Sequence, residues 1–239
     1  MTAAAYADFY AGVYRPLVSA FHGRVIDAVS VEDDQRPYAD RLADVLRPVL
    51  AGRNGAAILD VGGSTGVVSE RIASALQMRA VVLDPAPDEV ARARARGVEG
   101  IVGTIETWAP DGEGFELVLL CQTIDHLLDV SASLAGIRQA ITDNGILFVD
   151  IVDFRAAYTE SGSIEAATKI DHPYSLTQAT VEAFLARAGF EVAFKDFSPD
   201  HLHVGYVCRP VTPVTDSLPS AAAVAEFFRD LEILQGSRQ

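Results

Sequence analysis

Three glycines fall within five residues in the stretch AAILDVGGSTGVVSERIASAL, which covers residues 56–76. A short apolar run ending in Asp60 precedes Gly62, Gly63 and Gly66, and residues with helical spacing follow them. Glycine allows unusual backbone dihedrals and close approach to a ligand, and the N-terminus of the next helix offers unpaired N–H groups to an anion. The turn between this predicted strand and helix is therefore a candidate site for a ligand with an anionic group.

The spacing of the glycines distinguishes between three ligand classes. The stretch GGSTGVVS lacks the lysine and the spacing of a phosphate-binding loop, which argues against a nucleoside triphosphate. A dinucleotide-binding turn would need glycine at the positions of Ser64 and Val67. S-adenosylmethionine has no pyrophosphate and presents only an amino-acid carboxylate, so it fits this turn better than the other two.

A second carboxylate supports the same ligand. The apolar run in AVVLDPA ends in Asp84, 18 residues after Gly66. A carboxylate at the end of the neighbouring strand can accept hydrogen bonds from both ribose hydroxyls. The alternative is that Asp84 is a surface turn residue before Pro85; the preceding glycine turn favours the ribose role.

The segments ILDVGGSTG, VVLDPAPDEVARAR and FELVLLCQTIDHLLD resemble the motif series of class I S-adenosylmethionine-dependent methyltransferases. The resemblance extends from residue 57 to residue 209 and implies a seven-stranded sheet whose last strand is antiparallel. It implies that Asp60 and the turn at 62–66, including Ser64, hold the methionine part of the cofactor. Asp84, with Pro85 after it, would hold the ribose, and S-adenosylhomocysteine would be the product.

The adenine end departs from the family pattern. The family usually has an acidic residue after the glycine of VGTIETW, but this chain has Thr104. Ile105 could pack on the adenine ring, and Thr104 or Glu106 would have to meet the amino group. Cys121 and Gln122, at the end of the predicted fourth strand, complete the expected cofactor contacts.

Catalytic candidates follow the fourth strand in CQTIDHLLD. Ligands of open α/β sheets lie beyond the carboxyl ends of the strands, so Gln122, Thr123, Asp125 and His126 are well placed. His126, which matches a histidine common in related methyltransferases, could remove a proton from an acceptor hydroxyl, with Asp125 nearby. Alternatively His126 only orders the loop, because transfer from a sulfonium needs mainly alignment.

Two further aspartates lie in FVDIVDF, after the fifth strand. Asp150 and Asp153 are three residues apart and cannot both point along one face of a regular strand, so one of them could face the acceptor. With Asp125 they could offer oxygen ligands to magnesium. Scattered aspartates are ordinary in so acidic a chain, and the sequence therefore predicts no metal.

The polar segment 154–174 fits a substrate lid, in which His172 and Tyr174 are candidate acceptor contacts. The alternative is a turn that leads into the next helix. Further along, His201 and His203 are expected to share one strand face in HLHVGY, with a packing role at the sheet edge.

Residues 1–50 form a predicted helical cap, with a second helix over 36–50. Tyr10 and Tyr14 are one helical turn apart, so both could face the acceptor, and Arg15 could help to roof the site. Packing in the core is the alternative for these aromatic side chains.

Residues 51–210 form the predicted cofactor-binding core. Short apolar runs indicate strands at 57–61, 80–83, 100–102, 117–121 and 146–152, with helical patterns between most of them at 66–76, 88–96 and 131–141. Strands that are apolar on both faces and alternate with helices predict a doubly wound α/β fold with a mostly parallel sheet.

The end of the core differs from its beginning. Residues 177–188 form a predicted helix with Thr177 as its N-cap, and only SPD separates predicted strands at 190–197 and 201–209. This short connection permits a hairpin, so one strand is expected to run antiparallel. Residues 211–239 hold a linker and a helix at 221–234 that could pack on the domain or on a second copy, as a homodimer.

Composition excludes several classes of partner. The 239 residues carry 19 lysines and arginines against 33 aspartates and glutamates, a net charge of −14, which disfavours nucleic acid and anionic lipid as partners.

The start, MTAAAYADFY, lacks the basic and apolar blocks of a secretion signal, and a cytoplasmic location is expected. Cys121 and Cys208 lie in apolar runs, as expected for two reduced thiols.

The sequence predicts an S-adenosylmethionine-dependent methyltransferase that acts on a small-molecule acceptor. Three segments, YADFYAGVYRPLVSAFHG, QTIDHLLD and DHPYSLTQATVEAFLARAGF, also resemble bacterial methyltransferases of surface-sugar or natural-product pathways, which favours a hydroxyl acceptor. Two other classes stay open: a non-catalytic protein that binds the cofactor and regulates a partner, and an NAD-dependent oxidoreductase.

Overall fold

The computed structural model describes residues 2–110, 112, 114–169, 172–214 and 221–236. The strands are β1 (Ala57–Val61), β2 (Arg79–Asp84), β3 (Glu99–Val102), β4 (Phe115–Leu120), β5 (Ile141–Val152), β6 (Phe190–Phe197) and β7 (His203–Pro210). The helices are α1 (Ala3–Gly12), α2 (Tyr14–His22), α3 (Ala28–Leu46), α4 (Val67–Leu76), α5 (Pro87–Ala95), the 3₁₀ turn η1 (Ile124–His126), α6 (Val130–Ala140), α7 (Phe154–Ser161), α8 (Ile164–Ala167), α9 (Gln178–Arg187) and α10 (Ala221–Gly236).

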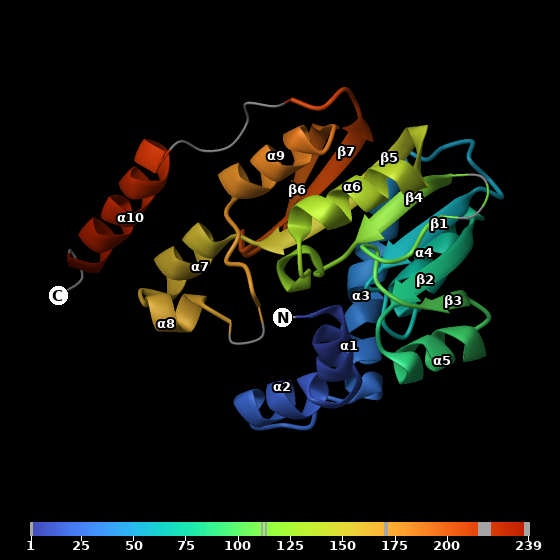
Figure 1. Ribbon diagram of the computed structural model, residues 1–239, viewed down its shortest axis with the longest axis horizontal. Coiled ribbons are helices and arrows are strands. Elements are labelled where there is room, and N and C mark those ends of the chain that lie inside the picture. The colour runs from blue at the N-terminus through green and yellow to red at the C-terminus, as the bar shows by residue number, and fades with distance from the viewer. Residues whose placement is uncertain (1, 111, 113, 170–171, 215–220, 237–239) are drawn as a thin grey trace.

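One seven-stranded sheet has the order β3-β2-β1-β4-β5-β7-β6. The neighbours from β3 to β5 pair in parallel, while β7 is antiparallel to both β5 and β6. Figure 1 shows the sheet between two layers of helices. The doubly wound α/β fold and its antiparallel last strand, both predicted from sequence, are confirmed.

Both faces of the sheet are buried because its central strands carry apolar side chains on both faces. Leu59 and Leu120 belong to a core that includes residues of α6 and α9. Ile58 and Leu119 face the opposite layer and pack with α3 and α4. This two-sided burial fixes the carboxyl ends of β1, β2 and β4 beside one another, and the candidate site lies at that edge.

The N-terminal segment divides into two parts. α3 packs directly on the sheet. It begins at Ala28 and ends at Leu46, whereas the sequence predicted a helix over 36–50, so the observed helix starts and ends earlier and is longer. The earlier start comes from a capping box. The Asp27 carboxylate accepts from the Ser30 N–H, and the Ser30 hydroxyl oxygen accepts from the Asp27 N–H. Pro37 is accommodated inside this helix.

The chain after β5 is more helical than its polar sequence suggests. The proposed lid, 154–174, contains α7 and α8, and its residues 170–171 lie outside the described part. Thr177 caps α9 as predicted, accepting from the Thr180 N–H. His201 was wrongly placed on a strand: it adopts a left-handed turn conformation (φ 58°), and β7 begins only at His203.

α10 packs against α7 through Leu231, whose carbonyl accepts from the Tyr158 hydroxyl at 2.9 Å. In the proposed linker 211–220, residues 215–220 lie outside the described part. Across the described residues, no helix combines the length and the apolarity needed to cross a membrane.

Candidate active site

The glycine turn after β1 leaves no space for side chains. A Cβ on Gly62 would lie 2.5 Å from a Thr123 methyl carbon, and a Cβ on Gly63 would lie 2.7 Å from the Asp60 carboxylate. Gly62 and Gly66 also have positive φ angles, 73° and 75°, which disfavour other residue types. The backbone can therefore approach a ligand here as closely as the sequence predicts.

Asp60 supplies an unsatisfied acceptor beneath this turn. It is 1 % exposed, and within the described part of the chain its Oδ2 has no hydrogen-bond partner. Burial raises the pKa of the carboxyl to about 7. A buried acceptor without a partner is unfavourable unless a ligand donates to it. The ammonium of an amino acid is such a donor, so the turn and Asp60 fit the methionine part of S-adenosylmethionine.

Asp84 ends β2 beside the same turn. Its carboxylate accepts from the backbone N–H of Ser64 at 2.9 Å and of Ala86 at 2.8 Å. Burial, to 7 % exposure, raises the pKa of Asp84 to about 6 despite these bonds. The two N–H donors orient the carboxylate at the rim of the crevice, with the half-buried Pro85 directly after it.

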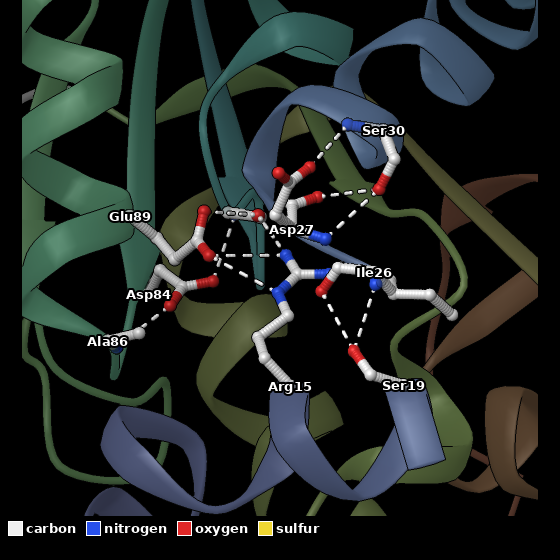
Figure 2. Close-up of polar contacts among 9 residues, drawn as sticks. Arg15, Ser19, Ile26, Asp27, Ser30, Asp84, Ala86 and Glu89 are labelled. Carbon is white, nitrogen blue, oxygen red and sulfur yellow. Dashed lines mark hydrogen bonds and ion pairs between the residues drawn. The ribbon is translucent and has the colours of Figure 1, made fainter. Parts of the chain in front are cut away.

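A polar network ties α2 to the other side of this crevice. The Arg15 guanidinium donates to the Ser64 hydroxyl and to Glu89, both at 3.2 Å, and Ser64 donates to Glu89 at 3.0 Å. Figure 2 shows the guanidinium beside the Glu89 carboxylate, with Asp84 next to them. Glu89 was not anticipated, because an acidic residue in the first turn of a helix such as α5 is already explained by the helix dipole.

The residues expected at adenine lie after β3. The Thr104 hydroxyl contacts that of Thr107 at 3.2 Å, and Glu106 accepts from the Ser133 hydroxyl at 2.6 Å. Ile105 is 2 % exposed and belongs to the core shared with α6. Their contacts with adenine stay predictions.

A second group of side chains gathers where β4 ends. Asp125 in η1 lies 2.7 Å from His172 (Oδ2 to Nδ1), and the rings of His126 and His172 meet edge to face with centroids 4.3 Å apart. From α1, the Tyr10 hydroxyl lies 3.0 Å from His126 Nδ1, and the Tyr6 hydroxyl donates to the His126 carbonyl at 3.1 Å. The predicted catalytic residues thus lie together with aromatic residues of the N-terminal helix.

Two more predicted acceptor contacts border this group. The Tyr14 ring lies edge to face with His126, with centroids 5.8 Å apart. The Tyr174 hydroxyl donates to the Leu128 carbonyl at 3.0 Å, which orders the segment that carries His172. The contact of Tyr6 with the loop was not predicted from the sequence, since a single aromatic position carries no signal for the loop it contacts.

Asp125 is the buried carboxylate of the group, at 6 % exposure. Burial alone would raise its pKa, but the hydrogen bond with His172 and the charges of both imidazoles outweigh burial and hold the pKa below its ordinary value. Its Oδ1 is buried and has no hydrogen-bond partner in the described residues. Asp125 therefore contacts His172 through Oδ2, and its second oxygen is buried and unsatisfied.

The other two aspartates each accept from one backbone N–H and one side chain. Asp150 is 3 % exposed and accepts from the Gln122 N–H at 2.5 Å and from the Tyr38 hydroxyl at 2.9 Å. Asp153 caps α7, accepting from the Arg155 N–H at 3.2 Å, and its other oxygen accepts from Gln178 at 2.9 Å. Both carboxylates therefore have hydrogen-bond partners of their own, and their predicted contacts with the acceptor stay predictions.

The turn after β4 borders an open space. Gln122 has a positive φ of 49°, and the Asp150 bond to its N–H holds it there. A cavity of about 220 Å³ adjoins Gln122 and is also lined by Tyr38, Asp150 and His203. Tyr38 had no sequence signal, because it lies on α3, more than eighty residues before the turn it supports. Cys121 and Cys208 are free thiols, as expected.

A family model described as "Methyltransferase domain" matches residues 31–193. The chain belongs to this family. The identification as a class I S-adenosylmethionine-dependent methyltransferase, made from three sequence motifs, is confirmed.

Curated relatives and solved structures agree with this membership. The chain is 30 % identical over 163 residues to a ubiquinone biosynthesis O-methyltransferase of Azorhizobium caulinodans, and the match covers 62 % of each chain. A second protein of the same name, from Methylobacterium sp., is 30 % identical over 41 % of this chain and 42 % of its own. The chain therefore spans less than two thirds of the relatives it matches.

The fold is shared with more distant structures. Magnesium protoporphyrin IX methyltransferase from Synechocystis, solved with bound S-adenosylhomocysteine, superposes with a TM-score of 0.65 at 13 % identity, covering 85 % of this chain and 97 % of that one. An S-adenosylmethionine-dependent methyltransferase from Clostridium acetobutylicum gives 0.60 at 11 % identity, covering 85 % and 98 %.

Proposed function

We propose that this chain uses S-adenosylmethionine to methylate a hydroxyl group of a small-molecule acceptor. The observation that carries the proposal is the placement of two groups on adjacent strands. The glycine turn follows β1, and Asp125, which contacts His172, follows β4; these two strands are parallel hydrogen-bonded neighbours. Both groups therefore lie at one edge of the sheet, where ligands of such folds bind.

The cofactor lies along the crevice from β1 to β3. Asp60 and the Gly63 backbone meet its amino-acid part, and Asp84 accepts from the ribose hydroxyls. When bound there, S-adenosylmethionine would supply an electrophilic methyl whose bond to sulfur breaks as the acceptor oxygen attacks, leaving S-adenosylhomocysteine. The contribution of this chain is to align the two reactants and to exclude water.

The acceptor lies between the tyrosines of α1 and α2 and the Asp125–His172 pair. Aromatic walls suit a ring, and the imidazoles with their carboxylate suit a hydroxyl that must lose a proton. The curated relatives carry the name O-methyltransferase, which supports oxygen rather than nitrogen or carbon as the methylated atom. A ring hydroxyl of a natural-product or sugar intermediate fits these requirements.

A methyl-transfer assay tests the proposal. The purified chain is incubated with methyl-labelled S-adenosylmethionine and phenol, catechol and sugar acceptors, and in parallel with a metabolite extract, and products are identified by mass spectrometry. Transfer to at least one hydroxyl is expected, with kcat at least tenfold lower in His126→Gln and unchanged in His201→Gln, which alters an exposed turn. Binding of S-adenosylhomocysteine without transfer to any acceptor would instead favour a non-catalytic cofactor-binding protein.

A further inference from the structure

We propose that Asp125, His126 and His172 bind a divalent metal ion, which holds the acceptor hydroxyl next to the methyl group. The inference rests on the proposed function for the role of the ion, while the binding site itself rests on these three side chains.

The geometry of the three residues fits shared ligation. Asp125, His126 and His172 each offer a ligand atom, and within the described part of the chain these atoms all lie within 4.8 Å of one another. The Asp125 and His172 atoms are 2.7 Å apart. Two ligands bound to one ion at about 2.1 Å are separated by roughly 3.0–3.4 Å, so small side-chain movements place all three around a single ion.

An independent observation points to a cation at the same place. Asp125 is 6 % exposed, yet its Oδ1 has no hydrogen-bond partner among the residues that the structure describes. A buried carboxylate oxygen normally has at least one hydrogen-bond partner, because without one it loses its hydration without compensation. A cation next to Oδ1 supplies that compensation. The surroundings also fit, since the Tyr10 hydroxyl contacts His126 and orients a ring that would ligate.

The ligand set indicates which ions fit. Magnesium and calcium prefer oxygen ligands, whereas imidazole suits zinc, iron, cobalt and other transition metals. Two histidines and one carboxylate leave coordination positions open, as in catalytic rather than structural sites. We therefore infer a transition-metal ion with open positions that face the acceptor.

Open positions on the ion define the chemistry of the acceptor. A hydroxyl oxygen bound to a divalent ion loses its proton more readily, and the proton passes to water while the electron pair stays on oxygen. That oxygen then forms the bond to the methyl carbon as the carbon–sulfur bond breaks, with no change in oxidation state. Two adjacent open positions would favour acceptors that chelate, such as a catechol or a vicinal diol.

Metal titration of the full chain tests the site without reference to catalysis. The protein is stripped with a chelator and titrated with Co²⁺, followed by calorimetry and by the visible absorption of bound cobalt, and then with Zn²⁺ and Mn²⁺. One ion per chain is expected to bind, with at least tenfold weaker binding in Asp125→Asn and in His172→Gln. His201→Gln, a histidine on an exposed turn, should bind like the unaltered chain.

Fold and function are followed separately. Equal S-adenosylhomocysteine affinity in all variants would show that the cofactor crevice is intact. Failure of all three ions to bind, or equal binding in the variants, would overturn the metal inference, and undiminished methyl transfer by the stripped protein would do the same while leaving the proposed function in place. Stoichiometric metal binding without methyl transfer to any acceptor would support the site and contradict the proposed function.

Discussion

The proposed cofactor site requires that residue 63 have no Cβ, as glycine provides. A Cβ at this position would lie 2.7 Å from the Asp60 carboxylate, so Gly63→Ala must displace either the turn or the buried acid. We expect at least tenfold weaker S-adenosylhomocysteine binding by calorimetry and a loss of about 1–3 kcal/mol in the free energy of unfolding. Gly12→Ala is the control, because nothing lies within 4 Å of a Cβ there, so binding should stay unchanged and the free energy of unfolding should not fall. Equal binding by the two variants would refute the packing argument.

The two buried aspartates predict the pH dependence of cofactor binding. Burial raises the pKa of Asp60 to about 7 and of Asp84 to about 6, and both must be ionised to accept from the ammonium and the ribose hydroxyls as carboxylates. S-adenosylhomocysteine affinity should therefore be highest near pH 8, fall about tenfold per pH unit between pH 7 and pH 6, and fall about a hundredfold per pH unit below pH 6. Calorimetry from pH 5 to pH 8 measures this, and a flat profile would contradict these ligand roles.

The same pKa values predict the opposite trend for stability without ligand. Both carboxyls have a higher pKa in the folded chain than the ordinary value of about 4 for an unfolded one. Their contribution to stability is complete below pH 4 and is lost as the pH rises through 6 and 7, because the folded state then ionises two buried groups. Substituting Asp60 by Asn should remove part of this decline in chemical denaturation experiments.

Between elements, the link from α2 to the cofactor crevice is the Arg15 side chain. It contacts Ser64 in the glycine turn and Glu89 in α5, so it holds the N-terminal helices over the crevice. Arg15→Ala should weaken S-adenosylhomocysteine binding about three- to tenfold and increase proteolysis within α1 and α2. Arg24→Ala removes an exposed ion pair with Asp34 and should change neither. Unaltered cofactor binding and unaltered proteolysis in Arg15→Ala would show that Arg15 does not hold α2 over the crevice.

The positions of helices and strands could be predicted from the sequence where apolar residues recur with a single regular spacing. β1 and β6 have the predicted limits because apolar residues and turn residues change abruptly at their ends. The start of α3 was misplaced because the Asp27 cap depends on a side-chain geometry that a run of polar residues does not reveal. In the candidate site, the neighbouring residues Asp125 and His126 could be predicted from one motif. The contacts of Tyr38 with Asp150 and of Glu89 with Ser64 could not, because they form only when distant segments fold together.

At the scale of the whole molecule, α10 attaches far from the crevice. Figure 1 shows α10 on the side of the molecule opposite α5, and Leu231 anchors it at 1 % exposure. Leu231→Asp should detach α10 and lower the free energy of unfolding by about 2–4 kcal/mol, because a charge would replace a buried side chain. S-adenosylhomocysteine affinity should not change. Ile233→Asp, at a position 69 % exposed, is the matched control and should leave thermal unfolding unaltered.

Titration of S-adenosylhomocysteine into the unaltered chain and into Asp84→Asn, by calorimetry at pH 8, tests the central claim most directly. The variant keeps the size of the side chain but removes the charge at the rim of the crevice and one of the two oxygens that accept from backbone N–H groups. We predict one site per unaltered chain and at least tenfold weaker binding in Asp84→Asn, with Asp88→Asn, an exposed position nearby, binding normally. No binding by the unaltered chain, or equal affinity in Asp84→Asn, would contradict the assignment of this crevice to the cofactor.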